Sequence, residues 1–362
     1  MRCLEKIKVN LVTHEVFKNT TSLYYEMGKN QLYEDIFQKN LSYIKNEVAN
    51  QNAEYFFKIF FSTDFQIRDN RYRTLLLDSS VANNKAEQLY KNLIMIFRRI
   101  HVENVEPFSL HLGEIHDLFD LLFVGVLSKE KLRYRKFGKK KGMFLSESFS
   151  MREELEKYLE ELKSVSKDQV IEPIFLYLNF MVDFINMEVY EMPYNESLGV
   201  LIFYILMVEN HFKAANYLSF FQRLNLYKAD YQEILNRISI QSKQGLPDLM
   251  PLMYFFINIF NGFYVELKEV SRDYQYDEDL SINKTDYIEN TISKLGDVFS
   301  KEDIRAKHPS ISDSTINRTL KRLSDANIIR AINVGRNAKW VKIVKKDTKH
   351  KFEGQIKMNL GE

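Results

Sequence analysis

The sequence predicts a mainly α-helical protein that ends in a small winged helix-turn-helix domain. Long apolar stretches with helical spacing predict the helical body, and glycine and proline are scarce, at 12 and 6 of 362 residues. Near the end of the chain, two short β-rich runs, 328–334 and 339–344, flank a glycine turn. This pattern predicts the hairpin, or wing, of the terminal domain.

The chain divides into five parts by pattern and composition. Residues 1–105 form an N-terminal helical region, and residues 106–265 form a second helical body. The segment 266–283 is acidic and polar, which is typical of a linker or a peripheral helix end. Residues 284–347 form the basic terminal domain, and 348–362 form a polar tail that we expect to be loose.

Charge is distributed unevenly between the terminal domain and the rest. Residues 284–362 hold 17 Lys and Arg against 10 Asp and Glu, a net charge of +7. The remaining residues hold 34 Lys and Arg (51 less 17) against 39 Asp and Glu (49 less 10), a net charge of −5. A basic domain on a mildly acidic body predicts a polyanionic partner for the domain.

Several classes of protein are excluded by composition and motifs. The single cysteine, Cys3, excludes a disulfide framework and a cysteine-based zinc site, and it fits a reducing, cytoplasmic location. The N-terminus lacks the apolar core of a signal peptide. The longest uncharged run, Leu249–Val265, is better interpreted as a buried core helix than as a membrane span. We find no HExxH, P-loop, Rossmann or GxSxG pattern.

The first two helices of the terminal domain are predicted from spacing and capping residues. Apolar residues Ile288, Ile292 and Leu295 share one helix face, and Gly296 ends that helix. The pair Ser300 and Asp303 has the spacing of a capping box, which predicts a second helix that ends near His308–Pro309.

The third helix and the wing carry the predicted DNA-binding residues. Ser312 can cap this helix, its buried stripe is Ile316, Leu320 and Leu323, and Asn327 suits a left-handed C-terminal cap. Placed in the major groove, the helix would present polar and basic side chains, with Arg336 and Lys339 of the wing on phosphates. The candidates on the helix are Thr315, Asn317, Arg318, Lys321 and Arg322.

The best candidates for base contacts are Asn317 and Arg318. An alternative is that the domain serves only protein contacts or dimerisation. The basic helix face and the net charge of +7 favour double-stranded DNA. A homodimer would suit the paired half-sites that such regulators commonly bind.

One stretch of the body resembles the centre of Fic-family proteins. An apolar helix pattern over Phe175–Tyr190 is followed by the loop sequence EMPYNESLG at 191–199 and a second apolar helix pattern from Val200 to about Phe212. The family's signature is HPFx[DE]GN[GK]R in a loop between two buried helices. The resemblance implies a helical bundle, and active members transfer AMP from ATP to a hydroxyl group of a target protein.

The resemblance extends over roughly residues 15–345 in the order of the family's elements. Residues 114–162 are similar to the family's helix, β-hairpin flap and following helix, and within them 131–135 stands where the family often has a Gly-x-Tyr-Arg-like strand. Residues 227–235 are similar to the segment after the motif helix, and 248–256 to the family's DLTPWxxFF stretch. A C-terminal winged helix also recurs in the family.

The loop departs from the signature where the family's chemistry is carried. Met192 stands at the general-base histidine, and a thioether cannot accept the proton of an attacking hydroxyl. Ser197 adds a side chain where backbone must approach phosphate, and Val200 replaces the phosphate-binding arginine. The loss of base, glycine and arginine together predicts a pseudoenzyme. The positions that retain the family's character are Pro193, Tyr194, Glu196 and Gly199.

Glu196 stands at the family's acidic, magnesium-binding position, and it is interpreted first as a solvated loop carboxylate and only weakly as a metal ligand. No cofactor is therefore expected. In the N-terminal region, Ser22–Glu26 matches the family's inhibitory pattern [ST]xxxE, in which the glutamate engages the loop arginine. With Val200 in place of that arginine, Glu26 would lack its ionic partner.

Three functions compete at this point. The first is a DNA-binding regulator or scaffold with a degenerate Fic-like body. The second is a divergent adenylyltransferase that uses ATP and Mg²⁺ on a protein target, which the retained Pro193, Glu196 and Gly199 favour. The third is an interaction module in which the flap, about 137–149, binds an extended peptide by strand addition. The sequence favours the first.

Overall fold

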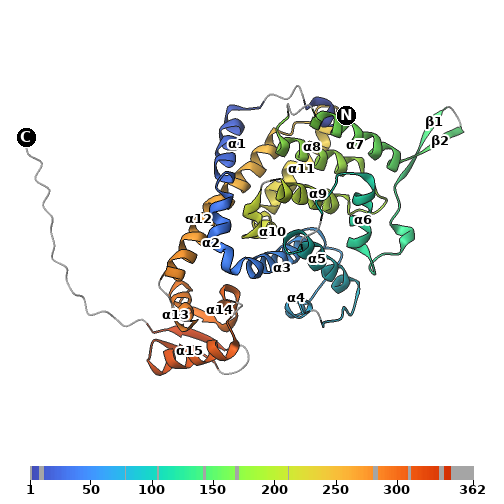
Figure 1. The fold of residues 1–362 in the computed structure, drawn as a ribbon. Coiled ribbons are helices and arrows are strands. Elements are labelled where there is room, and N and C mark those ends of the chain that lie inside the picture. The colour runs from blue at the N-terminus through green and yellow to red at the C-terminus, as the bar shows by residue number, and fades with distance from the viewer. Residues whose placement is uncertain are drawn as a thin grey trace, which may run out of the picture. The chain divides into compact units, whose positions relative to one another are not determined.

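The computed structural model divides into two compact units, the body (Met1–Ser271) and the C-terminal unit (Arg272–Glu362). Helix α12 (Met250–Asp279) begins in the body and continues past it, through most of the segment expected to be a linker or a helix end. Figure 1 shows the course of the chain. The structure describes residues 2–7, 12–77, 79–103, 106–141, 144–167, 171–210, 212–279, 284–308, 311–333 and 338–343.

The body is mainly helical, as expected, with one antiparallel hairpin, β1 (Lys136–Lys141) and β2 (Phe144–Ser150), among its described residues. The hairpin lies between α6 and α7, and its register shifts between Lys139 and Lys140. The helices that precede α12 are α1 (His14–Met27), α2 (Asn30–Phe37), α3 (Leu41–Phe60), α4 (Asp69–Leu75), α5 (Lys85–His101), α6 (Leu112–Phe123), α7 (Met151–Lys167), α8 (Pro173–Met187), α9 (Asn195–Glu209), α10 (Phe220–Leu226) and α11 (Lys228–Lys243). Short 3₁₀ turns lie at Leu4–Lys6, Gln38–Asn40, Lys129–Lys131 and Lys213–Asn216.

The core of the body is organised around α9. Every residue from Ser197 to Val208 is buried, which suits a helix that is apolar on all sides. One flank of α9 packs against α8, and the Phe203 ring lies 5.0 Å from that of Phe256 in α12. The loop between α8 and α9 is therefore fixed at both ends by buried helices.

Local chemistry explains where α8 begins and ends. The Glu172 carboxylate caps its first turn by accepting from the backbone N–H groups of Ile174 and Phe175, and Pro173 occupies the first position. Glu188 ends the helix with a left-handed conformation, at φ 48°. The chain then reverses over 189–194 and enters α9.

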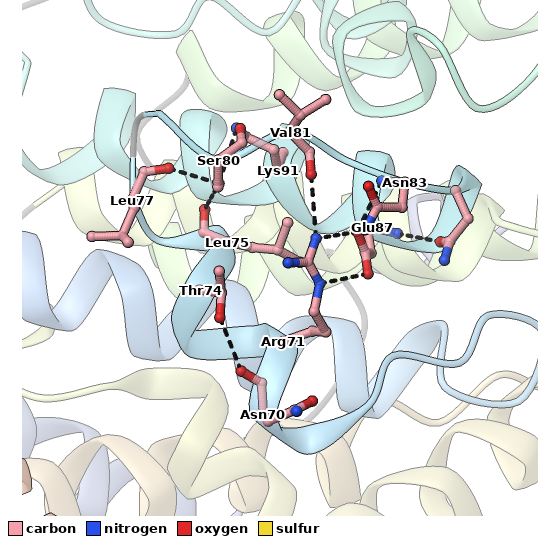
Figure 2. Close-up of polar contacts among 11 residues, drawn as sticks. Asn70, Arg71, Thr74, Leu75, Leu77, Ser80, Val81, Asn83, Glu87 and Lys91 are labelled. Carbon is pink, nitrogen blue, oxygen red and sulfur yellow. Dashed lines mark hydrogen bonds and ion pairs between the residues drawn. The ribbon is translucent and has the colours of Figure 1, made fainter.

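A partly buried ion pair fixes the connection between α4 and α5 (Figure 2). The Arg71 guanidinium donates to both carboxylate oxygens of Glu87, from Nε at 2.9 Å and Nη2 at 2.6 Å. It also donates to the carbonyl of Val81, and the Asn83 backbone N–H donates to Glu87. Arg71 lowers the pKa of Glu87 to about 2. The pair therefore ties α4, the connection and the first turn of α5 together.

The C-terminal unit packs helices α13 (Lys284–Lys294), α14 (Lys301–Lys307) and α15 (Asp313–Asp325) with the strands β3 (Val298–Ser300), β4 (Ile329–Ala331) and β5 (Lys339–Lys342). The three strands form an antiparallel sheet in the order β3-β5-β4. Its buried core consists of Ile288, Ile292, Phe299, Ile304, Ile311, Ile316, Leu320, Leu323 and Ile329, with Trp340 packed against it.

Capping residues set the helix ends in this unit. Ser300 and Asp303 form a reciprocal capping box at the start of α14, and the Ser312 hydroxyl accepts from the Thr315 backbone N–H at the start of α15. Asn327 adopts a left-handed conformation, at φ 55°, just after α15.

Within the described parts of the chain, the helices lack the combination of length and apolar character that a membrane span requires.

Candidate functional site

The loop between α8 and α9 is closed on itself by the side chain of Asn195. Its Oδ1 accepts from the Tyr190 backbone N–H at 2.9 Å. Its Nδ2 donates to the carbonyls of Tyr190, at 3.0 Å, and Met192, at 2.9 Å. These three bonds leave the Asn195 amide one further acceptor site and fix the backbone of 190–195 in a tight turn.

The segment before the hairpin pairs with the stretch of chain that enters this loop after α8. Tyr134 and Tyr190 form an antiparallel bridge, with backbone bonds from Arg135 to Val189 at 2.9 Å and from Glu191 to Arg133 at 3.1 Å. The hairpin, which the resemblance interprets as a flap, is thereby attached at the side of the loop.

Tyr194 fastens the middle of the loop to the body. Its ring lies 5.4 Å from that of Phe61 and 5.2 Å from that of Phe123, and its hydroxyl donates to Asp64 at 3.1 Å. Burial, together with the Asp64 carboxylate, raises the pKa of Tyr194 to about 12. The hydroxyl is thus a protonated structural donor rather than a candidate base.

The loop positions that the Fic resemblance associates with phosphate, 197, 199 and 200, are buried between helices. Val200 is 0% exposed. A Cβ on Gly199 would lie 3.1 Å from Ile185 and 3.3 Å from Phe184, so the small residue here permits close packing of α8 and α9. The Ser197 hydroxyl is also buried and donates to the Tyr194 carbonyl at 2.8 Å. None of these three residues offers a cation to a phosphate.

Three loop residues are more accessible. Pro193 is exposed, and Met192 and Glu196 are half-buried. Burial raises the pKa of Glu196, although the neighbouring Tyr231 hydroxyl and Lys228 act in the opposite direction. Over the residues that the structure describes, no group of three or more His, Cys, Asp and Glu side chains is placed to hold a metal ion.

The inhibitory-like pair lies on α1. Ser22 is exposed. The Glu26 carboxylate accepts from Lys29 at 3.1 Å and from Lys268 of α12 at 2.7 Å, and its pKa is lowered because these interactions outweigh its burial. Glu26 therefore has two cationic partners, of which Lys268 joins α1 to α12.

The second candidate surface is the outer face of α15, opposite its buried stripe. Asn317, Arg318 and Lys321 are exposed, and within the described parts of the chain their side chains have no hydrogen-bond or ion-pair partner. Thr315 is half-buried and shares a hydroxyl contact with Ser312 at 2.9 Å. This face therefore offers unpaired donors to an anionic partner.

The remaining candidates of the terminal domain differ in their surroundings. Arg322 is ion-paired with Glu289 of α13. Lys339 of β5 is exposed, and its backbone N–H donates to Asn333 at 2.7 Å. Arg336 lies outside the described residues.

Two features of these sites were missed by sequence reasoning. Arg330 is exposed on β4, next to the buried Ile329. The alternation of apolar and polar residues over 328–334 was a signal that could have placed Arg330 on the outer face of the sheet. No sequence signal identified Asn195 as the residue that closes the loop, because its three bonds depend on the tertiary path of the chain.

Comparison with known proteins identifies the fold. No family model matches the sequence, and no curated protein does. The structure is similar to that of a Fic family protein from Desulfovibrio desulfuricans G20, with a TM-score of 0.53 and 14% sequence identity. The similarity covers 93% of this chain and 98% of the other chain. The chain therefore has a Fic-like helical fold, as the loop and its flanking helices predicted.

Proposed function

We propose that the chain is a cytoplasmic DNA-binding regulator or scaffold, in which the C-terminal unit is a winged helix-turn-helix domain. The observation that carries this proposal is the outer face of α15, where Asn317, Arg318 and Lys321 are exposed and unpaired above a buried apolar stripe. The order helix, strand, helix, helix, strand, strand supports the domain type. Lys339 and Arg330 on the sheet add cations suited to phosphates.

The expected result is that the full chain binds duplex DNA and that Asn317→Ala, Arg318→Ala and Lys321→Ala together weaken this binding. Loss of two phosphate-contacting cations should reduce the slope of log affinity against log salt by about 2. Fluorescence anisotropy with a short mixed-sequence duplex at several salt concentrations measures both quantities. Lys163→Ala with Lys167→Ala on α7, both exposed, removes the same charge from the body and should leave the slope unchanged.

Absence of binding at low salt would contradict this proposal. It would be contradicted equally if the control pair and the α15 variant weakened binding to the same extent. The first result would favour a domain used for protein contacts. The second would mean that net charge alone, rather than this helix face, determines the interaction.

We further propose that the body does not transfer nucleotides, because the loop supplies neither a base at Met192 nor a phosphate-binding cation at the buried Val200. Incubation of the full chain with labelled ATP, Mg²⁺ and candidate proteins is expected to leave all of them unlabelled. Label transfer that disappears in Glu196→Ala would instead establish the alternative, a divergent adenylyltransferase.

A further inference from the structure

The basic residues on α15 are not equivalent in their surroundings. Arg318 and Lys321 have no charged partner within the described parts of the chain. Arg322, one turn beyond Arg318, forms an ion pair with Glu289 of α13. The side chains of this pair are 55% and 35% exposed, so the pair lies at the surface and water screens it. The pair therefore contributes little to the stability of the folded state. It does determine that Arg322, unlike Arg318 and Lys321, already has an ionic partner.

The position of Glu289 follows from the core of the C-terminal unit. Its neighbours Ile288 and Ile292 on α13 are buried in the same cluster as Leu320 and Leu323 of α15. Close packing of these two helices brings the residue next to Ile288 to the flank of α15, where Arg322 lies. The ion pair is thus a consequence of a fixed helix–helix contact rather than of two freely moving side chains.

We propose that Glu289 withholds Arg322 from nucleic-acid phosphate and thereby limits the affinity and the salt sensitivity of the DNA-binding surface. This inference rests on the proposed DNA-binding function. A phosphate that approaches α15 must compete with the Glu289 carboxylate for the guanidinium, and the carboxylate also repels the phosphate. The protein then binds duplex DNA through Arg318 and Lys321, with Arg322 as a reserve cation.

The test compares the full chain with its Glu289→Gln variant by anisotropy on a mixed-sequence duplex across a salt series. Release of Arg322 is expected to tighten binding by about two- to five-fold at low salt and to steepen the slope by about 0.9, the value for one added phosphate contact. Arg322→Ala should leave the original slope unchanged but abolish the gain in the Glu289→Gln background. Trp340, the single tryptophan, packs on the core of this unit, so its emission verifies folding of each variant.

A matched control separates a local effect from a general change of charge. Glu302→Gln on α14 removes the same charge, and its partner Arg305 remains paired with Asp313. This variant should bind DNA with an unchanged slope. The inference is overturned if Glu302→Gln gives the same gain, if Glu289→Gln gives none, or if Arg322→Ala alone lowers the slope. Failure of the unmodified chain to bind at all would overturn the proposed function as well, whereas the other outcomes affect only the role of Glu289.

Discussion

Val200→Arg is expected to destabilise the body by about 3–5 kcal/mol, a large part of the roughly 5–15 kcal/mol that holds a typical domain folded. Val200 is completely buried in α9, a helix without an exposed face between Ser197 and Val208. An arginine there would be an uncompensated buried charge and would also overfill a close-packed contact. The arginine that the Fic resemblance places at this position therefore cannot be restored by one substitution.

Thermal unfolding followed by far-UV circular dichroism measures this effect. Tryptophan emission gives an internal control, because Trp340 belongs to the C-terminal unit and should report an unchanged transition. Met192→His provides the matched comparison, since Met192 is half-buried in the same loop and its replacement should change stability by less than about 1 kcal/mol. A Val200→Arg protein that melts like the unmodified chain would show that the side chain can reach solvent, and it would reopen the case for phosphate binding.

The parts of the fold that sequence predicted are those determined by neighbouring residues. The structure contains three features that local patterns predicted: the capping box of Ser300 and Asp303, the cap of Ser312 and the left-handed conformation of Asn327. The stripe of Ile316, Leu320 and Leu323 is buried for the same reason, because helical spacing alone places these residues on one face. Such features depend on a few adjacent residues and can therefore be predicted from the sequence alone.

The parts that sequence could not predict depend on residues distant in the chain. Glu26 matched an inhibitory pattern, but no local pattern could identify Lys268, 242 residues away, as a partner. His101 matched no motif, and its interactions with Asn52 and Tyr204 explain its place in the core, where burial lowers its pKa to about 4. The loop residues could be aligned with a signature, yet the burial of Val200 became evident only from the packing of α9.

Arg71→Ala is expected to lower the stability of the body at neutral pH by clearly more than a surface substitution does, because it leaves the Glu87 carboxylate without its cation. Glu87 is 5% exposed, and of the donors that its carboxylate has among the described residues only the Asn83 backbone N–H would remain. Partial exposure of the Arg71 side chain, at 24%, places the effect below that of a fully buried pair. Arg73→Ala, an exposed arginine on the same helix, is the matched control and should change stability little.

The effect should depend on pH in a defined direction. Because Arg71 lowers the pKa of Glu87 from 4.5 to about 2, the carboxylate stabilises the folded state fully above pH 4.5, and this contribution is lost as pH falls toward 2. Urea unfolding by circular dichroism should therefore separate Arg71→Ala from the unmodified chain at neutral pH and bring them together only at about pH 2 and below. Adding Glu87→Gln should recover part of the loss, since it removes the stranded charge. An equal difference at both pH values would mean that Arg71 acts through packing and its bond to Val81 rather than through its charge.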